Sequence, residues 1–369
     1  MAAPSTPLLE HLSTLGEAPG KVRCTEALSP KAGPVCVTGA TGFIALHLVS
    51  QLLEKGYAVV ATVRSASNRE KMAPLLELQS KFGSDKLRVV GDVDCLKPES
   101  FDAAVAGCAG VFHTASPFHF KSSDPLVELV PPAVEGTRGC LAACMKAGCV
   151  RRVVVTSSFA AMFNAGKYPW DYTYTSKDWN ETSRPDGAGK FPEPAGPHGY
   201  RYSKLVAEAA AWDFSAKDDC PFDVACIHPP MVIGHNYNKP GSVDDLNTSS
   251  ASVLRLLTGK DRPGPNSMGF VDAADVARAH ISAYEHPEAG GRRFLCTVGA
   301  FLWTDIAQML KDLYPAMPVV TDPPADGPGL KMGLDTSGLK SLSNFAFTPI
   351  RDTLKRQCDS YFEQGFAKL

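Results

Sequence analysis

A tyrosine and a lysine four positions apart are the residues best suited to chemistry in this sequence. Tyr200 and Lys204 lie in an alanine-rich stretch, and residues at this spacing share one face of a helix. An ammonium beside a phenol favours the phenolate, so we expect Lys204 to lower the pKa of Tyr200 from about 10 towards neutrality. A phenol tuned in this way can donate a proton near pH 7. No other tyrosine of the chain has a lysine four residues later.

A pair of serines supplies a second candidate group for the same chemistry. Ser157 and Ser158 follow the apolar run Val153–Val155, which is typical of a buried parallel strand. Open parallel sheets bind ligands at the carboxyl ends of their strands, where a hydroxyl can stabilise a carbonyl oxygen that gains negative charge. Strand alternation turns the two serines in opposite directions, so the sequence leaves open which of them faces the cleft.

A glycine-rich turn and a nearby arginine are typical of a dinucleotide site. Gly39 and Gly42 lie between a predicted first strand and a first helix, where backbone amides can approach a pyrophosphate. Arg64 ends the predicted second strand. An acid at that position would favour NAD, whereas a cation accommodates the 2′-phosphate of NADP. We therefore expect NADPH or NADP+ as the cofactor.

Apolar runs and helical periodicities alternate along the first part of the chain. We predict strands at 35–38, 57–63, 87–90, 110–113, 152–156 and 222–227, with helices at 42–55, 68–82, 134–146 and 200–217. This alternation predicts an α/β fold with a doubly wound parallel sheet of the Rossmann type. Pro, Gly, Asn and Ser interrupt the pattern after Pro229, and further helices are expected near 246–257, 273–285, 305–313 and 350–366.

The predicted organisation has an extension and two unequal parts. Residues 1–33 are expected to form a poorly ordered N-terminal extension. Residues 34–234 are expected to form the NADP-binding Rossmann domain, to which 269–296 return. Residues 235–268 and 297–369 are expected to form a smaller C-terminal lobe that binds the substrate.

The composition excludes several other classes of protein. The 369 residues carry 37 Lys and Arg against 39 Asp and Glu, a net charge of −2, which offers no bulk basicity for nucleic acid or an anionic membrane. No run of 18 apolar residues could span a bilayer. The eleven cysteines include no Cys-x-x-Cys pair, and several lie in apolar segments. We expect reduced packing residues in a cytoplasmic protein without a metal site.

Together these motifs resemble those of the extended short-chain dehydrogenases/reductases. The resemblance covers about residues 34–366 and is strongest for the branch that holds dihydroflavonol reductases, cinnamoyl-CoA reductases and fungal NADPH-dependent ketone and methylglyoxal (carbonyl) reductases. It rests on the segments Val37–Ala45, Val63-Arg64 with Lys71, Phe112–Pro117, Val153–Ser158, Tyr200–Lys204 and Phe270–His280.

The resemblance implies a role for each motif. Ser158 matches the catalytic serine, Tyr200 the catalytic acid and Lys204 the lysine that binds the ribose. Cofactor contacts are implied for Gly39, Thr41, Gly42, Phe43, Ile44, Arg64, Lys71, Asp92, Val93, Thr114, Ala115, Ser116, Tyr200, Lys204, Pro229 and Val232. Substrate-pocket positions of the fungal ketone reductases are matched by Phe118, Phe159, Phe163 and Met231.

Three departures from the family pattern bear on the substrate and on one loop. Phe163 stands where dihydroflavonol reductases keep an asparagine for the flavonoid hydroxyls. The segment His198–Tyr202 lacks the Asn-Trp-Tyr-type signature of the cinnamoyl-CoA branch. His235 replaces the proline that usually follows Gly234, which leaves the loop geometry there open.

The expected activity is NADPH-dependent reduction of aldehydes and ketones, such as keto esters and dicarbonyls, to alcohols at a Ser-Tyr-Lys site. The expected partner is a small carbonyl substrate, with neither nucleic acid nor membrane, and the protein is expected to be a monomer or homodimer. Two alternatives stay open. A sugar-nucleotide epimerase or dehydratase of the same superfamily would use the same residues with tightly held NAD. A non-catalytic NADP sensor would need no Tyr–Lys pair.

Overall fold

In the computed structural model, which describes residues 20–116, 122, 124–323, 325, 327, 329–343 and 345–369, seven parallel strands form the central sheet. They are β1 (Val35–Val37), β2 (Val59–Thr62), β3 (Leu87–Val90), β4 (Gly110–His113), β5 (Arg152–Thr156), β7 (Asp223–His228) and β10 (Arg293–Leu295). Their order is β10-β7-β5-β4-β1-β2-β3, and each neighbouring pair is parallel. The doubly wound α/β fold predicted from the alternating pattern is confirmed.

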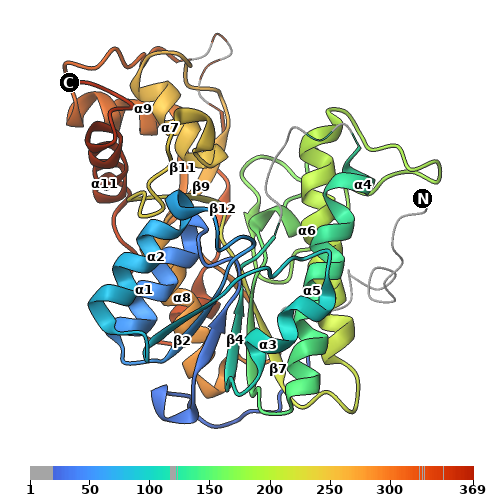
Figure 1. The fold of residues 1–369 in the computed structure, drawn as a ribbon. Coiled ribbons are helices and arrows are strands. Elements are labelled where there is room, and N and C mark those ends of the chain that lie inside the picture. The colour runs from blue at the N-terminus through green and yellow to red at the C-terminus, as the bar shows by residue number, and fades with distance from the viewer. Residues whose placement is uncertain are drawn as a thin grey trace.

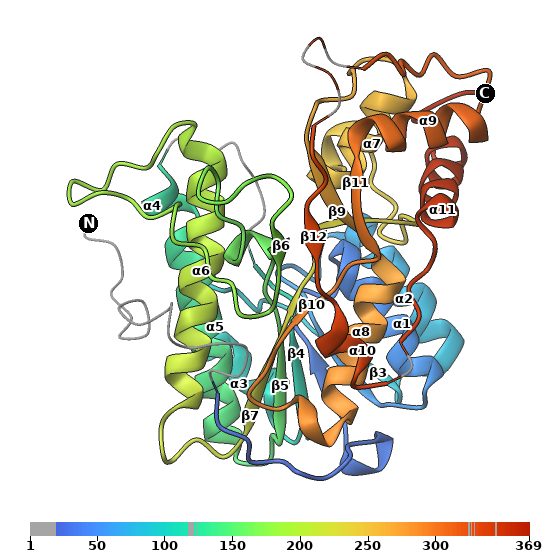
Figure 2. The same cartoon turned by 180° about the vertical axis from the view of Figure 1, so that it is seen from behind.

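Helices cover both faces of this sheet (Figures 1 and 2). One face carries α1 (Phe43–Glu54), α2 (Arg69–Phe82) and α8 (Ala273–Glu285), and the other carries α3 (Asp102–Val105), α5 (Val130–Ala147) and α6 (Ala195–Ser215), with the short α4 (Pro125–Glu128) beside α5. Successive strand residues point to opposite faces. Val35 and Val37 therefore belong to the hydrophobic core under α1 and α8, whereas Cys36 belongs to the core under α5 and α6.

A smaller lobe is built mainly from the C-terminal part of the chain, at the upper left of Figure 1. Its sheets pair β8 (Met231–Ile233), β9 (Ser267–Asp272) and β11 (Gly299–Leu302), and β6 (Thr173–Tyr174) with β12 (Gly333–Leu334). Its helices are α7 (Thr248–Leu257), α9 (Trp303–Leu313) and α11 (Ile350–Glu363), whereas the short α10 (Ser337–Lys340) packs against β10 of the central sheet. Short 3-10 helices occur at Pro30–Ala32, Pro98–Phe101, Phe159–Ala161, Val243–Asp245 and Pro287–Ala289. Of the elements within residues 267–296, α8 packs against the central sheet and β10 is one of its strands. By contrast, β9 pairs with β8 in the sheet of the smaller lobe.

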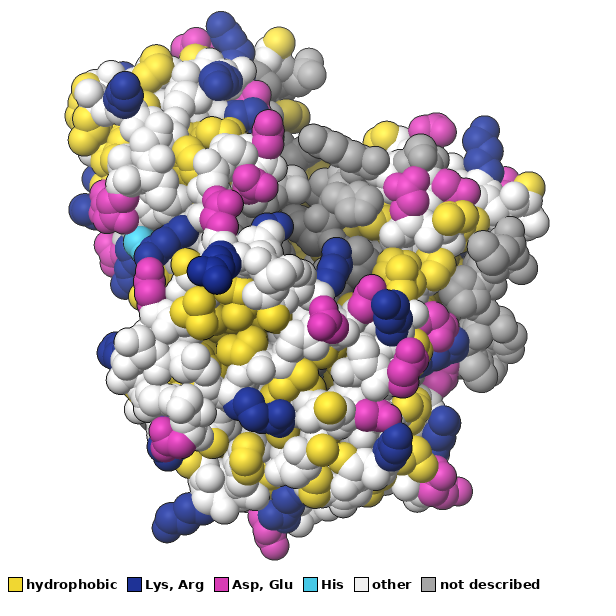
Figure 3. Space-filling view, viewed as in Figure 1, with side chains coloured by type: hydrophobic (Ala, Val, Ile, Leu, Met, Phe, Trp, Pro, Cys, Tyr) yellow, Lys and Arg dark blue, Asp and Glu magenta, His cyan; other side chains and the backbone are white. Residues whose placement is uncertain are grey.

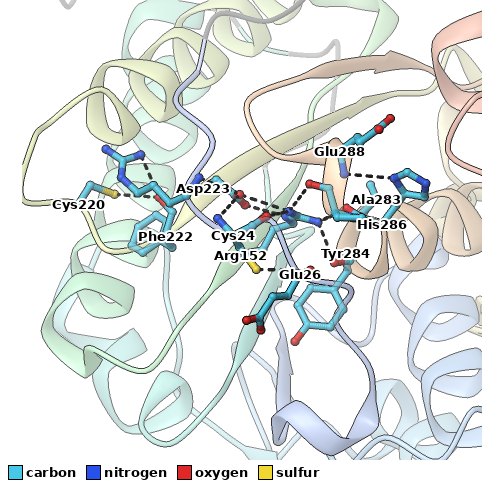
Figure 4. A network of polar contacts seen from close by, with 12 residues as sticks. Cys24, Glu26, Arg152, Cys220, Phe222, Asp223, Ala283, Tyr284, His286 and Glu288 are labelled. Carbon is cyan, nitrogen blue, oxygen red and sulfur yellow. Dashed lines mark hydrogen bonds and ion pairs between the residues drawn. The ribbon is translucent and has the colours of Figure 1, made fainter.

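Residues 20–33 pack against the amino-terminal edge of the central sheet, which corrects the expected disorder for this part of the extension. Cys24 and Leu28 are buried. Arg152 and Asp223, at the starts of β5 and β7, form a completely buried ion pair with Nε and Oδ1 2.7 Å apart. The carbonyl of Cys24 accepts from Arg152 Nη2 at 2.9 Å, and its N–H donates to Asp223 Oδ2 at 3.1 Å (Figure 4). A buried ion pair needs such extra partners, and they come from this segment. Residues 1–19 lie outside the described residues.

The surface shows a mixture of charges that matches the small net charge. On the face seen in Figure 3, Lys and Arg side chains alternate with Asp and Glu side chains. All eleven cysteines are free thiols, and all but Cys95 and Cys149 are buried. None of the helices in the described part of the chain is both long enough and apolar enough to cross a membrane.

Candidate active site

A cavity of about 230 Å³ lies at the carboxyl ends of β1, β4 and β5, beside the smaller lobe. It is lined by Gly39, Gly42, Phe43, Ile44, Ala45, Thr114, Ser116, Thr156, Ser157, Ser158, Tyr200, Lys204, Pro229, Pro230, Val232, Asn247 and Ser249. The glycine turn, the serines and the Tyr–Lys pair, which are far apart in the sequence, therefore meet in one place. The carboxyl end of a parallel sheet is where such folds bind their ligands.

The glycine turn leaves backbone amides open at the start of α1. Gly39 has φ +64°, and a Cβ added to it would lie 3.1 Å from Cα of Ala115. Gly42 precedes α1 and has no side chain to cap it, and a Cβ there would lie 3.1 Å from the carbonyl oxygen of Gly39. The first amides of a helix have no partner within the helix and carry its positive end. This cradle fits the pyrophosphate of a dinucleotide.

Thr38 joins the ends of β1 and β4 below this turn. Its hydroxyl lies 3.0 Å from Nδ1 of His113 and accepts from the backbone N–H groups of Thr114 and Ala115 at 3.1 and 3.0 Å. These bonds place Thr114 and Ser116 in the cavity wall, whereas Ala115 lines a small hollow behind it. His113 is thus a satisfied structural residue. Among the described residues, no three His, Cys, Asp or Glu side chains converge to hold a metal ion.

Ser158, Tyr200 and Lys204 lie together, with their side chains largely buried. Tyr200 and Lys204 on α6 are 7 % and 8 % exposed. The hydroxyl of Ser158 is hydrogen-bonded to the Tyr200 side chain and also accepts from the N–H of Ala160 at 3.1 Å. Lys204 Nζ donates to the carbonyl of Thr156 at 3.4 Å. Ser157 also lines the cavity, but it donates its hydroxyl away from Tyr200, to Glu208 at 2.6 Å. The side-chain hydrogen bonds therefore show that Ser158 is the serine beside Tyr200, a question that the sequence left open.

The expected lowering of the Tyr200 pKa by Lys204 is wrong for this structure. Burial raises the pKa of Tyr200, and the hydrogen bond with Ser158 lowers it only in part. The reason is that a phenolate loses its hydration inside the cavity wall. Burial likewise lowers the pKa of Lys204 to about 8, although the negative charge of Glu208 raises this pKa in part. At neutral pH, Tyr200 is therefore a phenol and Lys204 an ammonium.

Several residues expected at the cofactor lie outside the cavity lining. Arg64 and Lys71 are exposed, at the end of β2 and in the first turn of α2, and neither pairs with a carboxylate of the described residues. Asp92 is also exposed, in a left-handed conformation with φ +59°, and Val93 beside it is buried. Thr41 is partly buried in the turn before α1. The two free cations fit a phosphate group on the β2 side of the cradle.

Phe159, Phe163 and Met231, three of the four expected substrate-pocket residues, are absent from the cavity lining. Phe159 and Phe163 pack on Tyr174, with ring centroids 5.2 and 5.7 Å apart. Met231 contacts the core of the smaller lobe. Phe118 lies outside the described residues.

The smaller lobe contributes two lining residues that the sequence analysis missed. Asn247 and Ser249 lie at the start of α7, where Asn247 Oδ1 accepts from the N–H of Ser250 at 3.0 Å. An asparagine before a helical pattern signals a helix start, but no local signal says that it borders a cavity. The loop in which His235 replaces a proline is tied to α1, because the carbonyl of His235 accepts from His47 Nε2 at 2.9 Å.

Comparisons with known proteins agree with this fold. A family described as male sterility proteins matches residues 37–268. A cinnamoyl-CoA reductase of Medicago truncatula is 36 % identical and aligns over 91 % of this chain and 97 % of its own length. A ketoreductase of Aspergillus niger is 35 % identical, over 90 % and 99 %. The structure of the yeast methylglyoxal/isovaleraldehyde reductase Gre2 complexed with NADPH superimposes with a TM-score of 0.80 at 30 % identity, covering 90 % of this chain and 99 % of that one.

Proposed function

Since this chain belongs to the extended short-chain dehydrogenases/reductases, in the family of male sterility proteins, we propose that it is an NADPH-dependent carbonyl reductase. It reduces aldehydes and ketones to alcohols. The observation that carries this proposal is the meeting of Ser158, Tyr200 and Lys204 in the cavity that also contains the glycine turn. Function is read from such a site rather than from the fold, which many activities share.

When bound, NADPH would supply a hydride to the carbonyl carbon of the substrate. The Ser158 hydroxyl donates a hydrogen bond to the carbonyl oxygen and stabilises the negative charge that develops on it. Tyr200, kept as a phenol by burial, then transfers its proton to that oxygen and completes the alcohol. The Lys204 ammonium stabilises the phenolate that remains. The smaller lobe contributes Asn247 and Ser249 to the substrate side of the cavity.

The cofactor is held by the glycine turn and by the two free cations. The open amides at the start of α1 receive the pyrophosphate, and Arg64 with Lys71 receives the 2′-phosphate. A guanidinium can bind a phosphate through two parallel hydrogen bonds, so Arg64 is expected to favour NADPH over NADH.

Replacing Arg64 by alanine is expected to weaken NADPH binding by roughly 10- to 150-fold, because a charge-assisted bond contributes about 1.5–3 kcal/mol. NADH binding should stay unchanged, since NADH lacks the 2′-phosphate. Cofactor fluorescence titrations measure both affinities. Arg69→Ala removes another exposed arginine and serves as the control. Equal losses for NADPH and NADH would contradict the assignment of Arg64.

The proposed activity is tested by NADPH consumption with a panel of dicarbonyls, keto esters, aryl aldehydes, a dihydroflavonol and a cinnamoyl-CoA thioester. We expect turnover of the dicarbonyls and keto esters. Rapid reduction of the dihydroflavonol or the thioester alone would overturn this choice of substrate. Release of NAD from the denatured protein, without turnover of any carbonyl, would favour the sugar-nucleotide alternative.

A further inference from the structure

A buried carboxylate behind the cavity connects several of the elements that build it. Glu208 follows Lys204 by one turn of α6, and its side chain is completely buried. Its two oxygens accept from Ser157 Oγ at 2.6 Å, His228 Nε2 at 2.7 Å, Arg293 Nε at 2.7 Å and Trp212 Nε1 at 3.2 Å. These partners come from the ends of β5 and β7, from β10 and from α6 itself. One carboxylate thus joins three adjacent strands to the helix that carries Tyr200.

Glu208 is ionised in this network. Burial by itself would raise its pKa, but Arg293 and His228 hold the pKa well below its ordinary value. The guanidinium of Arg293 has further partners, because its Nη1 donates to the carbonyls of Ser176 and Asp178 and its Cζ lies 3.6 Å from the Trp179 ring centroid. A buried charge with so many partners is fixed in position.

Lys204 borders the same small hollow as Glu208, beside the main cavity. The groups around its ammonium are Glu208 on α6, Cys95 from the loop after β3, His113 from β4 and the Thr156 carbonyl from β5. Tyr200, one turn earlier on α6, lines the main cavity together with Lys204. Burial raises the pKa of Cys95 to about 11, so that thiol is neutral at pH 7. Among these described groups, Glu208 is therefore the one that carries a full negative charge near neutral pH.

We propose that Glu208 is a positioning residue of the active site, whose carboxylate keeps the buried Lys204 ammonium charged and fixes the Ser157–Ser158 turn beside Tyr200. The inference builds on the proposed function, because it assumes that a charged Lys204 and an oriented Ser158 are needed. Glu208 does not reach the cavity lining and acts only through these two neighbours.

The charge part of the proposal is tested with Glu208→Gln, which keeps the shape of the side chain and removes its charge. The rate at which acetic anhydride modifies Lys204 in the cofactor-free protein, followed against pH by peptide mass spectrometry, reports the fraction of neutral amine. We expect half-deprotonation near pH 8 in the original protein and about one pH unit lower in the variant, because a nearby negative charge is lost. The alkaline limb of kcat/KM should move in the same direction.

Glu26→Gln is the matched control. It breaks an exposed 2.8 Å pair with Arg151 at the opposite edge of the sheet and should leave both profiles unchanged. A Glu208→Gln protein with a lower melting temperature but with both pH profiles unmoved would overturn the charge part, because a purely structural residue behaves in that way. The labelling of Lys204 needs no turnover, so it tests the charge part of the proposal even if the original protein reduces no carbonyl. Such a failure of carbonyl reduction would overturn the proposed function alone.

The positioning part is tested separately with Ser157→Ala, which removes one hydroxyl donated to Glu208 and no charge. This small change also keeps the proposal testable if Glu208→Gln does not fold. We expect kcat to fall about tenfold as the turn carrying Ser158 loosens, while KM for NADPH and the Lys204 labelling profile stay unchanged. An unchanged kcat would overturn the role of Glu208 in holding this turn.

Discussion

Replacing Tyr200 by phenylalanine is expected to abolish carbonyl reduction and to leave NADPH binding almost intact. The substitution removes one oxygen from a ring that is 7 % exposed and keeps the packing of α6. Without the phenol, no proton is delivered to the oxygen after hydride transfer. A positioned acid typically contributes about 10²- to 10⁴-fold to the rate, so kcat should fall by at least two orders of magnitude. NADPH oxidation measures the rate, and fluorescence titration measures cofactor binding.

Tyr202→Phe provides the control for this substitution. Tyr202 lies two positions further along α6, is equally buried and packs against Phe191 with a ring-centroid distance of 5.8 Å. It is absent from the cavity lining, so the loss of its hydroxyl should leave kcat unchanged. Full activity in Tyr200→Phe, or equal losses in both variants, would refute Tyr200 as the proton donor.

Replacing Asp223 by alanine is expected to destabilise the protein by about 3–5 kcal/mol, because it leaves the buried Arg152 guanidinium without its counter-charge. The same change removes the acceptor that Asp223 offers to the backbone N–H groups of Arg23 and Cys24. Segment 20–28 should then detach from the sheet edge. Urea unfolding measures the free energy, and hydrogen exchange at Cys24 reports whether the segment stays in place.

Asp218→Ala is the control for Asp223→Ala, because it removes a nearby ion pair that is exposed instead of buried. Asp218 pairs with Lys21 at 2.6 Å, but its side chain is fully exposed. Exposed pairs contribute little because water screens them, so this variant should unfold almost as the original protein does. If Asp223→Ala were as stable as Asp218→Ala, the buried pair would not be what holds the N-terminal segment.

The sequence determined the features that depend on local pattern. Buried strands and amphipathic helices repeat with periods of about 2 and 3.6 residues, and these periods are visible in the chain itself. The predicted strands and the doubly wound sheet were confirmed for that reason. The Gly39–Gly42 turn and the Tyr200–Lys204 pair each lie within one turn or one helix, so their spacing alone places their members together.

Tertiary structure decided what depends on residues far apart in the chain. Ser157 and Ser158 differ because Glu208, 51 positions after Ser157, accepts the hydroxyl of one and leaves the other to Tyr200. Arg293 reaches the same carboxylate across 85 positions. No period or motif links such residues, since their contact exists only after the chain has folded.

The same reasoning explains two expectations that failed. The Tyr200 pKa is raised because burial, which no spacing rule contains, outweighs the effect of a neighbouring charge. Residues 20–33 are ordered because their backbone satisfies an ion pair formed by Arg152 and Asp223, 71 positions apart from each other. The sequence by itself thus determined the sheet and indicated the candidate reacting groups. Only the folded chain decided their protonation, their orientation and their supports, because these depend on desolvation and on long-range contacts.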